Sequence, residues 1–262
     1  MESPGELAAR IERSDLPPGA DERFSGYGIM AQPFRSGHVL ALRRFPHTSV
    51  GPAYTSVWHC DPEGRWTMWN DAPALTACPR YFGPALAASE QRAIEVSWPD
   101  PWSVRVRIEG VLAWDTTIAP SPATRLMTAM ASHLPDALWR NATVLAAMSR
   151  MAGPTLRAGV IRLHGRVPTG QWFRVKIARV WTTMNVAATL HGEGLGPTGA
   201  APTQRWLGGF ALPNRGLFAV GQATFETFAP ERHRQALPGS PSWSRPAGQL
   251  KADAPKRSTP SR

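Results

Sequence analysis

Charged residues are scarce in this sequence. They make up 18% of its 262 residues, whereas soluble domains average roughly 25%. Lysine is nearly absent, because Lys176, Lys251 and Lys256 are the only three, and arginine therefore carries almost all of the positive charge. The net charge of +10 follows in part from this arginine-biased composition. It does not by itself indicate a nucleic-acid-binding protein.

Residues that bind metals or form catalytic triads are also few. Cys60 and Cys78 are the only cysteines, too few for a zinc site or a disulfide framework. His38, His47 and His59 lack the short spacings of metal ligands, and no Gly-x-Ser-x-Gly elbow of a serine hydrolase is present. We therefore predict neither a metal site nor a cofactor.

Long apolar runs are missing as well. No stretch of 18 or more apolar residues exists, so no transmembrane helix is expected. The acidic N-terminus lacks the basic and apolar regions of a secretory signal. We expect a cytoplasmic protein.

Aromatic residues and alternating patterns dominate what is present. Eleven tryptophans accompany only three tyrosines, and tryptophan combines a large apolar area with an N–H group that needs a partner. Val104, Val106 and Ile108 alternate with arginines, as in an antiparallel strand with one buried face. Comparable patterns predict strands at 38–43, 53–59, 65–69, 93–98, 103–109, 111–118, 159–167, 172–181, 186–191, 204–207 and 217–228.

One segment departs from this pattern. Residues 123–152 have apolar residues at helical spacing, and Gly153-Pro154 ends the segment. We therefore predict a mainly β fold, an antiparallel β-barrel or sandwich of about a dozen strands with a central helical insertion. Residues 1–23 are expected to form a loose leader, residues 24–228 a single β-rich domain, and residues 229–262 a basic disordered tail.

A pocket for a ligand is predicted in the segment from Tyr54 to Tyr81, where aromatic and polar residues are densest. Strand alternation places Tyr54 and Trp58 on one face, and aromatic walls suit apolar or ring-containing ligands. The alternative is an ordinary aromatic core. The candidate ligand-binding residues are Tyr54, Trp58, Trp66, Trp69, Arg80 and Tyr81.

Three further residues are candidates for acid or base catalysis. Histidine is the side chain whose charge ordinarily changes near neutral pH, which makes His59 a candidate, and Asp71 belongs to the same segment. Asp115 lies in an apolar strand, where burial would raise the pKa of its carboxyl group and keep it neutral. The alternative for Asp115 is a solvent-facing position at the end of its strand.

The run Gly37-His38-Val39-Leu40-Ala41-Leu42, then Val57-Trp58-His59 and Trp114-Asp115, resembles lipocalin-like proteins, particularly the hydroxyneurosporene synthases (carotenoid hydratases). This resemblance covers roughly residues 24–228. It implies a lipocalin-like β-barrel with an apolar ligand and acid-catalysed chemistry on an isoprenoid. The helical insertion departs from that family, and its catalytic residues are not carried over to this sequence.

The leading hypothesis is therefore a protein that binds a hydrophobic small molecule in a β-barrel pocket, with enzymatic activity left open. The alternative is an interaction protein without enzymatic activity, in which an arginine-rich surface and the basic tail bind an acidic partner, a nucleic acid or an anionic surface. A third hypothesis, carbohydrate binding, requires Trp66, Trp69 or Trp172 to lie flat on the surface.

Overall fold

Alternating apolar and polar positions form strands along most of the chain in a computed structural model that describes residues 2–238. The strands of this part are β1 (Glu22–Pro33), β2 (Val39–Thr48), β3 (Tyr54–Cys60), β4 (Trp66–Asn70), β5 (Ala88–Gln91), β6 (Glu95–Asp100), β7 (Ser103–Ile108), β8 (Leu112–Ala119), β9 (His164–Arg166), β10 (Trp172–Leu190), β11 (Glu193–Gly194), β12 (Trp206–Leu207), β13 (Phe210–Ala211) and β14 (Leu217–Phe225). The helices are α1 (Pro4–Glu12), α2 (Pro79–Phe82), α3 (Pro122–His133) and α4 (Ala142–Leu156), with 3₁₀ turns η1 (Ala74–Thr76), η2 (Gly83–Ala85) and η3 (Leu138–Arg140).

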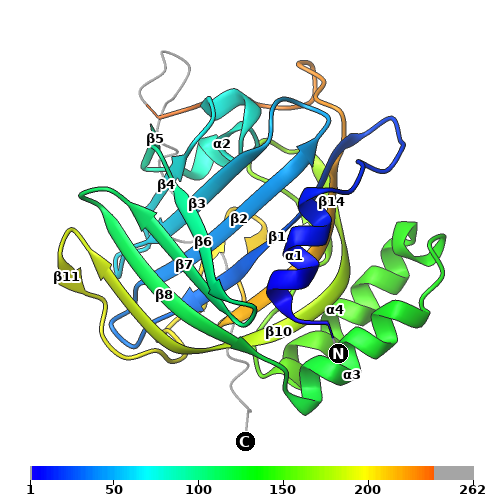
Figure 1. The fold of residues 1–262 in the computed structure, drawn as a ribbon. Helices are drawn as coiled ribbons and strands as arrows, with labels where there is room; N and C mark the ends of the chain where they lie inside the picture. The colour runs from blue at the N-terminus through cyan, green and yellow to red at the C-terminus, as the bar shows by residue number, and fades with distance from the viewer. Residues whose placement is uncertain (1, 239–262) are drawn as a thin grey trace, which may run out of the picture.

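Twelve of these strands form one sheet, whose main path runs β5-β4-β3-β2-β1-β14-β10-β8-β7-β6. Neighbours along this path are antiparallel except for β4 and β5. The sheet curls so that β6, β7 and β8 lie across β1, β2 and β3 (Figure 1). Because β5 and β6 stand at opposite ends of the path, the sheet is a half-barrel. The mainly β class and the antiparallel sheet predicted from the sequence are confirmed.

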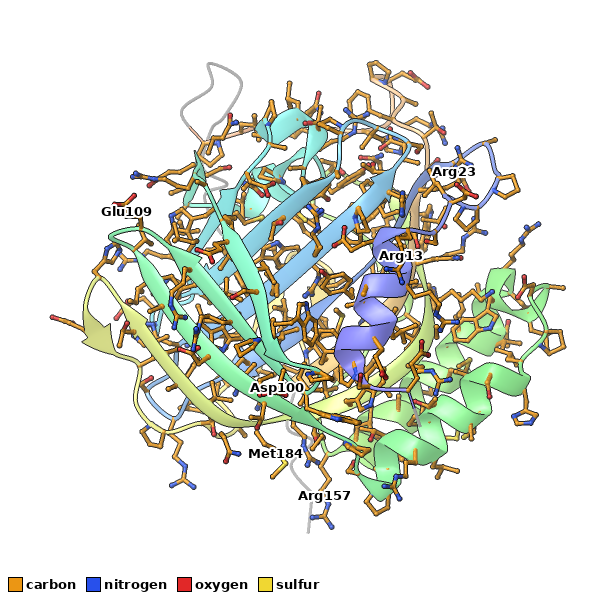
Figure 2. The ribbon with its side chains drawn as sticks, viewed as in Figure 1. Arg13, Arg23, Asp100, Glu109, Arg157 and Met184 are labelled. Atoms are coloured by element: carbon orange, nitrogen blue, oxygen red, sulfur yellow. The ribbon has the colours of Figure 1, made fainter. Side chains whose placement is uncertain are left out.

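Two apolar clusters lie on opposite faces of β2 and β3. Leu40, Leu42 and Val57 pack with residues of β7 and β8 inside the curl. Ala41 and Trp58 point the other way and pack against α2. Side chains fill both faces of the sheet, whereas Met184 lies at the outer edge of the molecule and is 50% exposed (Figure 2).

The predicted helical insertion corresponds to α3, η3 and α4, which pack along β10 at one side of the half-barrel (Figure 1). Within residues 2–238, no helix has the length and apolar character needed to cross a membrane. Pro154 lies in the last turn of α4, which therefore ends at Leu156, slightly later than predicted.

The predicted strands differ from the structure in several places. The central strand β1 was not predicted, because both of its faces are buried and it shows no alternation. The segment 159–167 forms only the short strand β9. The segments 172–181 and 186–191 belong to one 19-residue strand, β10, in which Asn185 adopts a positive φ of 46° at an irregularity in the pairing with β8.

The N-terminal segment, expected to be a loose leader, contains the packed helix α1. Ser3 and Glu6 form a capping box at its start, and Leu7 is buried to 3% exposure within the curl. Glu12 at its end pairs with Arg44 of β2 at 2.9 Å. This ion pair and the buried Leu7 attach the helix to the sheet.

The predicted basic tail falls largely outside the described residues. Its first part, 229–238, packs on the domain, with Ala236 buried and the amide of Arg234 donating to Thr169 O at 2.9 Å. Residues 239–262 lie beyond the part that the structure describes.

The curl depends on close backbone contacts at glycines of the central strands. A Cβ atom on Gly28 of β1 would overlap with the carbonyl oxygen of Leu42, and one on Gly221 of β14 with that of Lys176. Any side chain at these positions would push the strands apart.

We expect Gly28→Ala to lower the free energy of unfolding by about 2–3 kcal/mol, because the added methyl group meets backbone that cannot move without breaking the sheet. Gly194→Ala is the control, since a Cβ at Gly194 meets no atom within 4 Å, and its effect should stay below about 0.5 kcal/mol. Urea denaturation measures both. Equal effects of the two substitutions would contradict this account of the curl.

Candidate functional site

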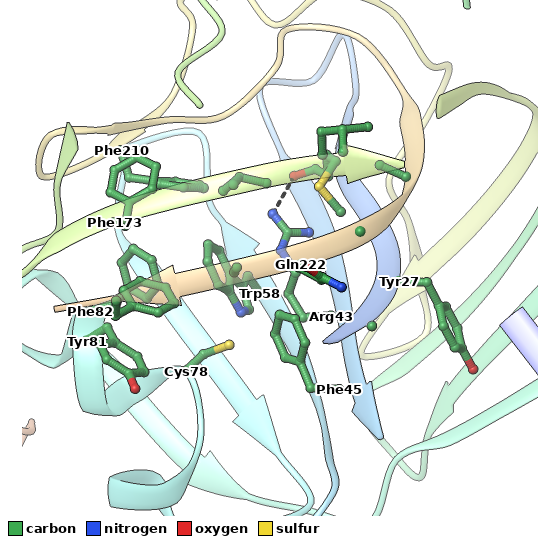
Figure 3. A pocket seen from close by; sticks show the side chains of 18 of the residues that line it. Tyr27, Arg43, Phe45, Trp58, Cys78, Tyr81, Phe82, Phe173, Phe210 and Gln222 are labelled. Carbon is green, nitrogen blue, oxygen red and sulfur yellow. Dashed lines mark hydrogen bonds between the residues drawn. The ribbon is translucent and has the colours of Figure 1, made fainter. Parts of the chain in front are cut away.

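An apolar cavity of about 80 Å³ lies between β2, β3, α2, β10 and β14 (Figure 3). Its aromatic lining consists of Tyr27, Phe45, Tyr54, Trp58, Tyr81, Phe82, Phe173, Phe210 and Phe225. Phe210 comes from the separate β12–β13 hairpin, which covers this face of the sheet. The lining therefore joins segments that are far apart in the sequence.

Strand alternation places the lining residues. On β3, Tyr54 and Trp58 face the cavity side, whereas Val57 faces the curl. On β2, Ala41 and Phe45 flank Arg43 on the cavity side. Arg43 thus occupies a position where its neighbours on the same face are apolar.

Arg43 is the one charged residue in the lining of this cavity. It is 6% exposed. Its Nη1 donates to the carbonyl oxygens of Ile29 at 2.7 Å and Leu42 at 2.9 Å, and its Nη2 donates to that of Met30 at 3.0 Å. The guanidinium lies over the ring of Trp58, 4.7 Å from its centroid. Burial lowers the pKa of Arg43 to about 10, so it is still a cation at neutral pH.

No carboxylate balances this charge among the described residues. The ionisable neighbours are Cys78 and Tyr54, whose Sγ and hydroxyl lie 3.4 Å apart. Burial raises the pKa of both groups, which keeps them neutral. The charge of Arg43 therefore lies uncompensated beside an apolar space.

A chain of hydrogen bonds fixes the ring of Trp58. Its Nε1 donates to Ser56 Oγ at 3.0 Å, and that hydroxyl donates to Asn70 Oδ1 at 2.7 Å. Within residues 2–238, Asn70 Nδ2 has no hydrogen-bond partner. The indole plane under Arg43 is thus set by its neighbours.

A second polar network holds Tyr81 at the cavity wall. Tyr81 donates a short hydrogen bond to Glu22, which also accepts from Arg80 Nη2 at 2.7 Å. The Tyr81 ring stacks on Phe225 at 4.0 Å between centroids. Burial alone would raise the pKa of Glu22, but hydrogen bonds from Arg80 and Tyr81, with the charge of Arg80, outweigh it and hold the pKa below its ordinary value of 4.5.

The structure brings only part of the predicted ligand site together. Tyr54, Trp58 and Tyr81 line the cavity. Trp66 belongs to the same apolar cluster, but its Nε1 donates to Trp206 O at 3.0 Å outside the lining. Trp69 lies on the opposite face, within the curl, and Arg80 pairs with Glu22 behind the cavity wall.

The three candidate catalytic residues do not line the cavity. His59 lies on the far face of β3, where its Nε2 is 2.9 Å from His38 Nδ1 and its ring stacks on Trp69. Asp71 follows β4 and accepts from the amide of Thr55 at 2.7 Å. These positions separate both side chains from the apolar space.

Asp115 differs from the expectation of a buried neutral acid. Its side chain is 41% exposed and pairs with Arg105 at 2.8 Å and Arg107 at 2.5 Å. Its slight burial would raise the pKa, but these two arginines hold the pKa below its ordinary value. The side chain is ionised because it faces outward on β8, between the buried Trp114 and Thr116.

Arg43 and Cys78 are among the lining residues that sequence reasoning missed as site candidates. The alternation Val39, Ala41, Arg43, Phe45 carried the signal, since a charged residue interrupts an otherwise apolar face. No group of three or more His, Cys, Asp or Glu side chains placed to hold a metal occurs in the part of the chain that the structure describes.

A second hollow, of about 390 Å³, lies between the helical insertion and the edge of β10 and β14. Of its charged residues, Arg174 pairs with Asp21 at 2.8 Å and Glu226 with Arg232 at 2.8 Å, whereas Arg140 forms no ion pair within residues 2–238. Trp172, which is 47% exposed, lies in its lining with the guanidinium of Arg166 over its ring. Arg140 is exposed, whereas the unpaired charge of Arg43 is buried, so the larger hollow is a weaker candidate than the smaller cavity.

No family model matches this chain, and no curated protein does. The solved structures to which it is similar include two acetoacetate decarboxylases. One is an acetoacetate decarboxylase from Legionella pneumophila subsp. pneumophila str. Philadelphia 1, at 11% identity and a TM-score of 0.35, over 82% of this chain and 88% of the other. The second is also described as an acetoacetate decarboxylase, at 10% identity and a TM-score of 0.38, over 83% and 89%. Neither is a carotenoid hydratase, so that resemblance stays a prediction.

Two buried ionisable groups, His59 and Glu22, should make the free energy of unfolding depend on pH. Burial, and then the charge of His38, lower the pKa of His59 from 6.5 to about 4. The unfolded chain therefore takes up this proton first as the pH falls, so the free energy of unfolding should drop by roughly 3 kcal/mol between pH 6.5 and 4. His59→Gln should flatten the curve in this window, whereas His133→Gln, at an exposed position, should not. Identical curves for all three proteins would rule out a buried neutral His59.

Glu22 should change the free energy of unfolding at a lower pH than His59 does. Its lowered pKa means that its contribution is fully present above pH 4.5 and is lost as the pH falls further. We expect Glu22→Gln to cost about 2 kcal/mol at neutral pH, because the charge-assisted hydrogen bonds from Arg80 and Tyr81 weaken, and progressively less in acid. Glu63→Gln, which removes an exposed ion pair with Arg65, should change stability by less than about 1 kcal/mol. A Glu22→Gln deficit that does not shrink in acid would contradict the assignment.

Proposed function

We propose that this protein binds a small, largely apolar molecule in the cavity between β2, β3, α2, β10 and β14. The observation that supports it is an unfilled space of about 80 Å³ with an almost wholly apolar and aromatic lining. Interiors are otherwise close-packed, and apolar pockets with a few polar groups are the usual binding sites for small molecules.

The size of the cavity limits the ligand. An engineered cavity of about 150 Å³ takes up benzene, so this smaller space favours molecules of only a few carbon atoms. A carotenoid or another long isoprenoid would require the lining to open widely. We therefore propose a short ligand in place of the isoprenoid that the sequence resemblance implied.

Binding rather than catalysis is the function that the geometry favours. His59, Asp71 and Asp115 are remote from the cavity lining, and Tyr54 and Cys78 are neutral in it because burial raises their pKa values. The interaction-protein hypothesis depends on an arginine-rich surface together with the tail, and the tail lies largely outside the described residues. Carbohydrate binding has little support from Trp66 and Trp69, which are 3% and 4% exposed, and the exposed Trp172 has the guanidinium of Arg166 over its ring.

Methionine methyl groups provide a local probe of ligand uptake. Met30 lines the cavity, whereas Met184 is exposed at the outer edge of β10. In protein labelled with ¹³C at the methionine methyl groups, millimolar propionamide should shift the Met30 signal saturably and leave the Met184 signal unchanged. Geraniol, a longer isoprenoid alcohol, should not reproduce the shift, because it exceeds the cavity.

A filled cavity provides the control. Ala223→Leu places a larger side chain in the lining and should abolish the Met30 response, whereas Ala113→Leu on β8, remote from the cavity, should preserve it. No saturable Met30 shift with propionamide or propionate, or an equal response in Ala223→Leu, would overturn the proposal. A stronger Met30 response to geraniol than to propionamide would restore the isoprenoid hypothesis.

A further inference from the structure

Arg43 places a buried positive charge at the cavity, with three N–H groups already engaged. Its Nη1 and Nη2 donate to the carbonyl oxygens of Ile29, Met30 and Leu42. A guanidinium has five N–H donors. The Nε–H and one Nη2–H therefore have no acceptor among residues 2–238.

The three engaged donors have a role in the fold. No residue of β1 between Tyr27 and Gln32 has a partner on β2, and Arg43 supplies donors to the carbonyl oxygens of this stretch. A neutral amide side chain can also donate hydrogen bonds to carbonyl oxygens. This role therefore does not account for a full positive charge at a position that is 6% exposed.

The charge lacks a partner of opposite sign. Burying an ion without one is strongly unfavourable, and here only carbonyl dipoles and the face of Trp58 at 4.7 Å offset it. Tyr54 and Cys78, the ionisable groups beside it, are neutral. The site is therefore electrostatically incomplete in the part of the chain that the structure describes.

We propose that the ligand of this cavity carries a single carboxylate group, which pairs with the free N–H groups of Arg43 while its short apolar part packs among the aromatic side chains. The inference rests on the proposed function and names the class of ligand. A planar carboxylate matches two parallel N–H donors of a guanidinium.

One negative charge fits better than two. Arg43 is the single charged residue of the lining, so a doubly charged phosphate would bring a second charge with no cation to meet it. The ring of Trp58, held through Ser56, fixes the plane in which the guanidinium presents its free donors. Short monocarboxylates are therefore the ligands selected, and inorganic phosphate and neutral analogues are disfavoured.

The test compares propionate with propionamide, which has the same shape without the charge, by titrating the Met30 methyl signal of the full chain. Propionate should bind at least about tenfold more tightly than propionamide, because a charge-assisted pair replaces neutral hydrogen bonds. Inorganic phosphate should give no saturable shift. These comparisons need no variant, so they stand even if a substitution of Arg43 impairs folding.

Two variants test whether Arg43 causes the preference for propionate over propionamide. Arg43→Gln should abolish the preference for propionate and leave propionamide binding within about twofold, whereas Arg44→Gln, on the opposite face of β2, should retain the preference. Circular dichroism confirms that each variant is folded. Equal affinity for the two probes in the wild-type protein, or an undiminished preference in folded Arg43→Gln, would overturn this inference and leave the proposed function standing. Failure of both probes to bind would overturn the proposed function itself.

Discussion

The contact between the Arg43 guanidinium and the backbone of β1 links the fold of this protein to its candidate site. The pairing of β1 with β2 is interrupted between Tyr27 and Gln32. Within this stretch of β1, Arg43 donates hydrogen bonds to the carbonyl oxygens of Ile29 and Met30. Unpaired buried carbonyl groups would be costly. Arg43 thus satisfies backbone carbonyl groups of β1 and also places a positive charge in the lining of the cavity.

This arrangement explains why the cavity is polar at one point and apolar elsewhere. The β12–β13 hairpin and α2 cover the sheet with aromatic side chains, which exclude water and leave the charge in a medium of low dielectric constant. Attraction between opposite charges is stronger there than in water. One buried cation can therefore select an anionic ligand, provided that the ligand is small enough to enter.

The sequence indicated much of the fold and less of the site. Strands such as β7 and β8 were predictable because one face is buried and the other meets solvent, which makes their residues alternate. Strand β1 was not, because both faces are covered. Trp66 and Trp69 were both assigned to the ligand site, although an odd spacing on a strand places residues on opposite faces. The lining from Phe173 and Phe210 could not be predicted, because the long-range packing of β10 and the β12–β13 hairpin brings them to β3.

Arg43 itself can be observed by following its Nε–H signal in the NMR spectrum as propionate is added. This signal should move downfield and its proton should exchange more slowly with water, because the carboxylate accepts a hydrogen bond from it. An Nε–H signal unchanged at propionate concentrations that saturate the Met30 response would show that the ligand lies elsewhere in the cavity. That result would contradict the assignment of Arg43 as its partner.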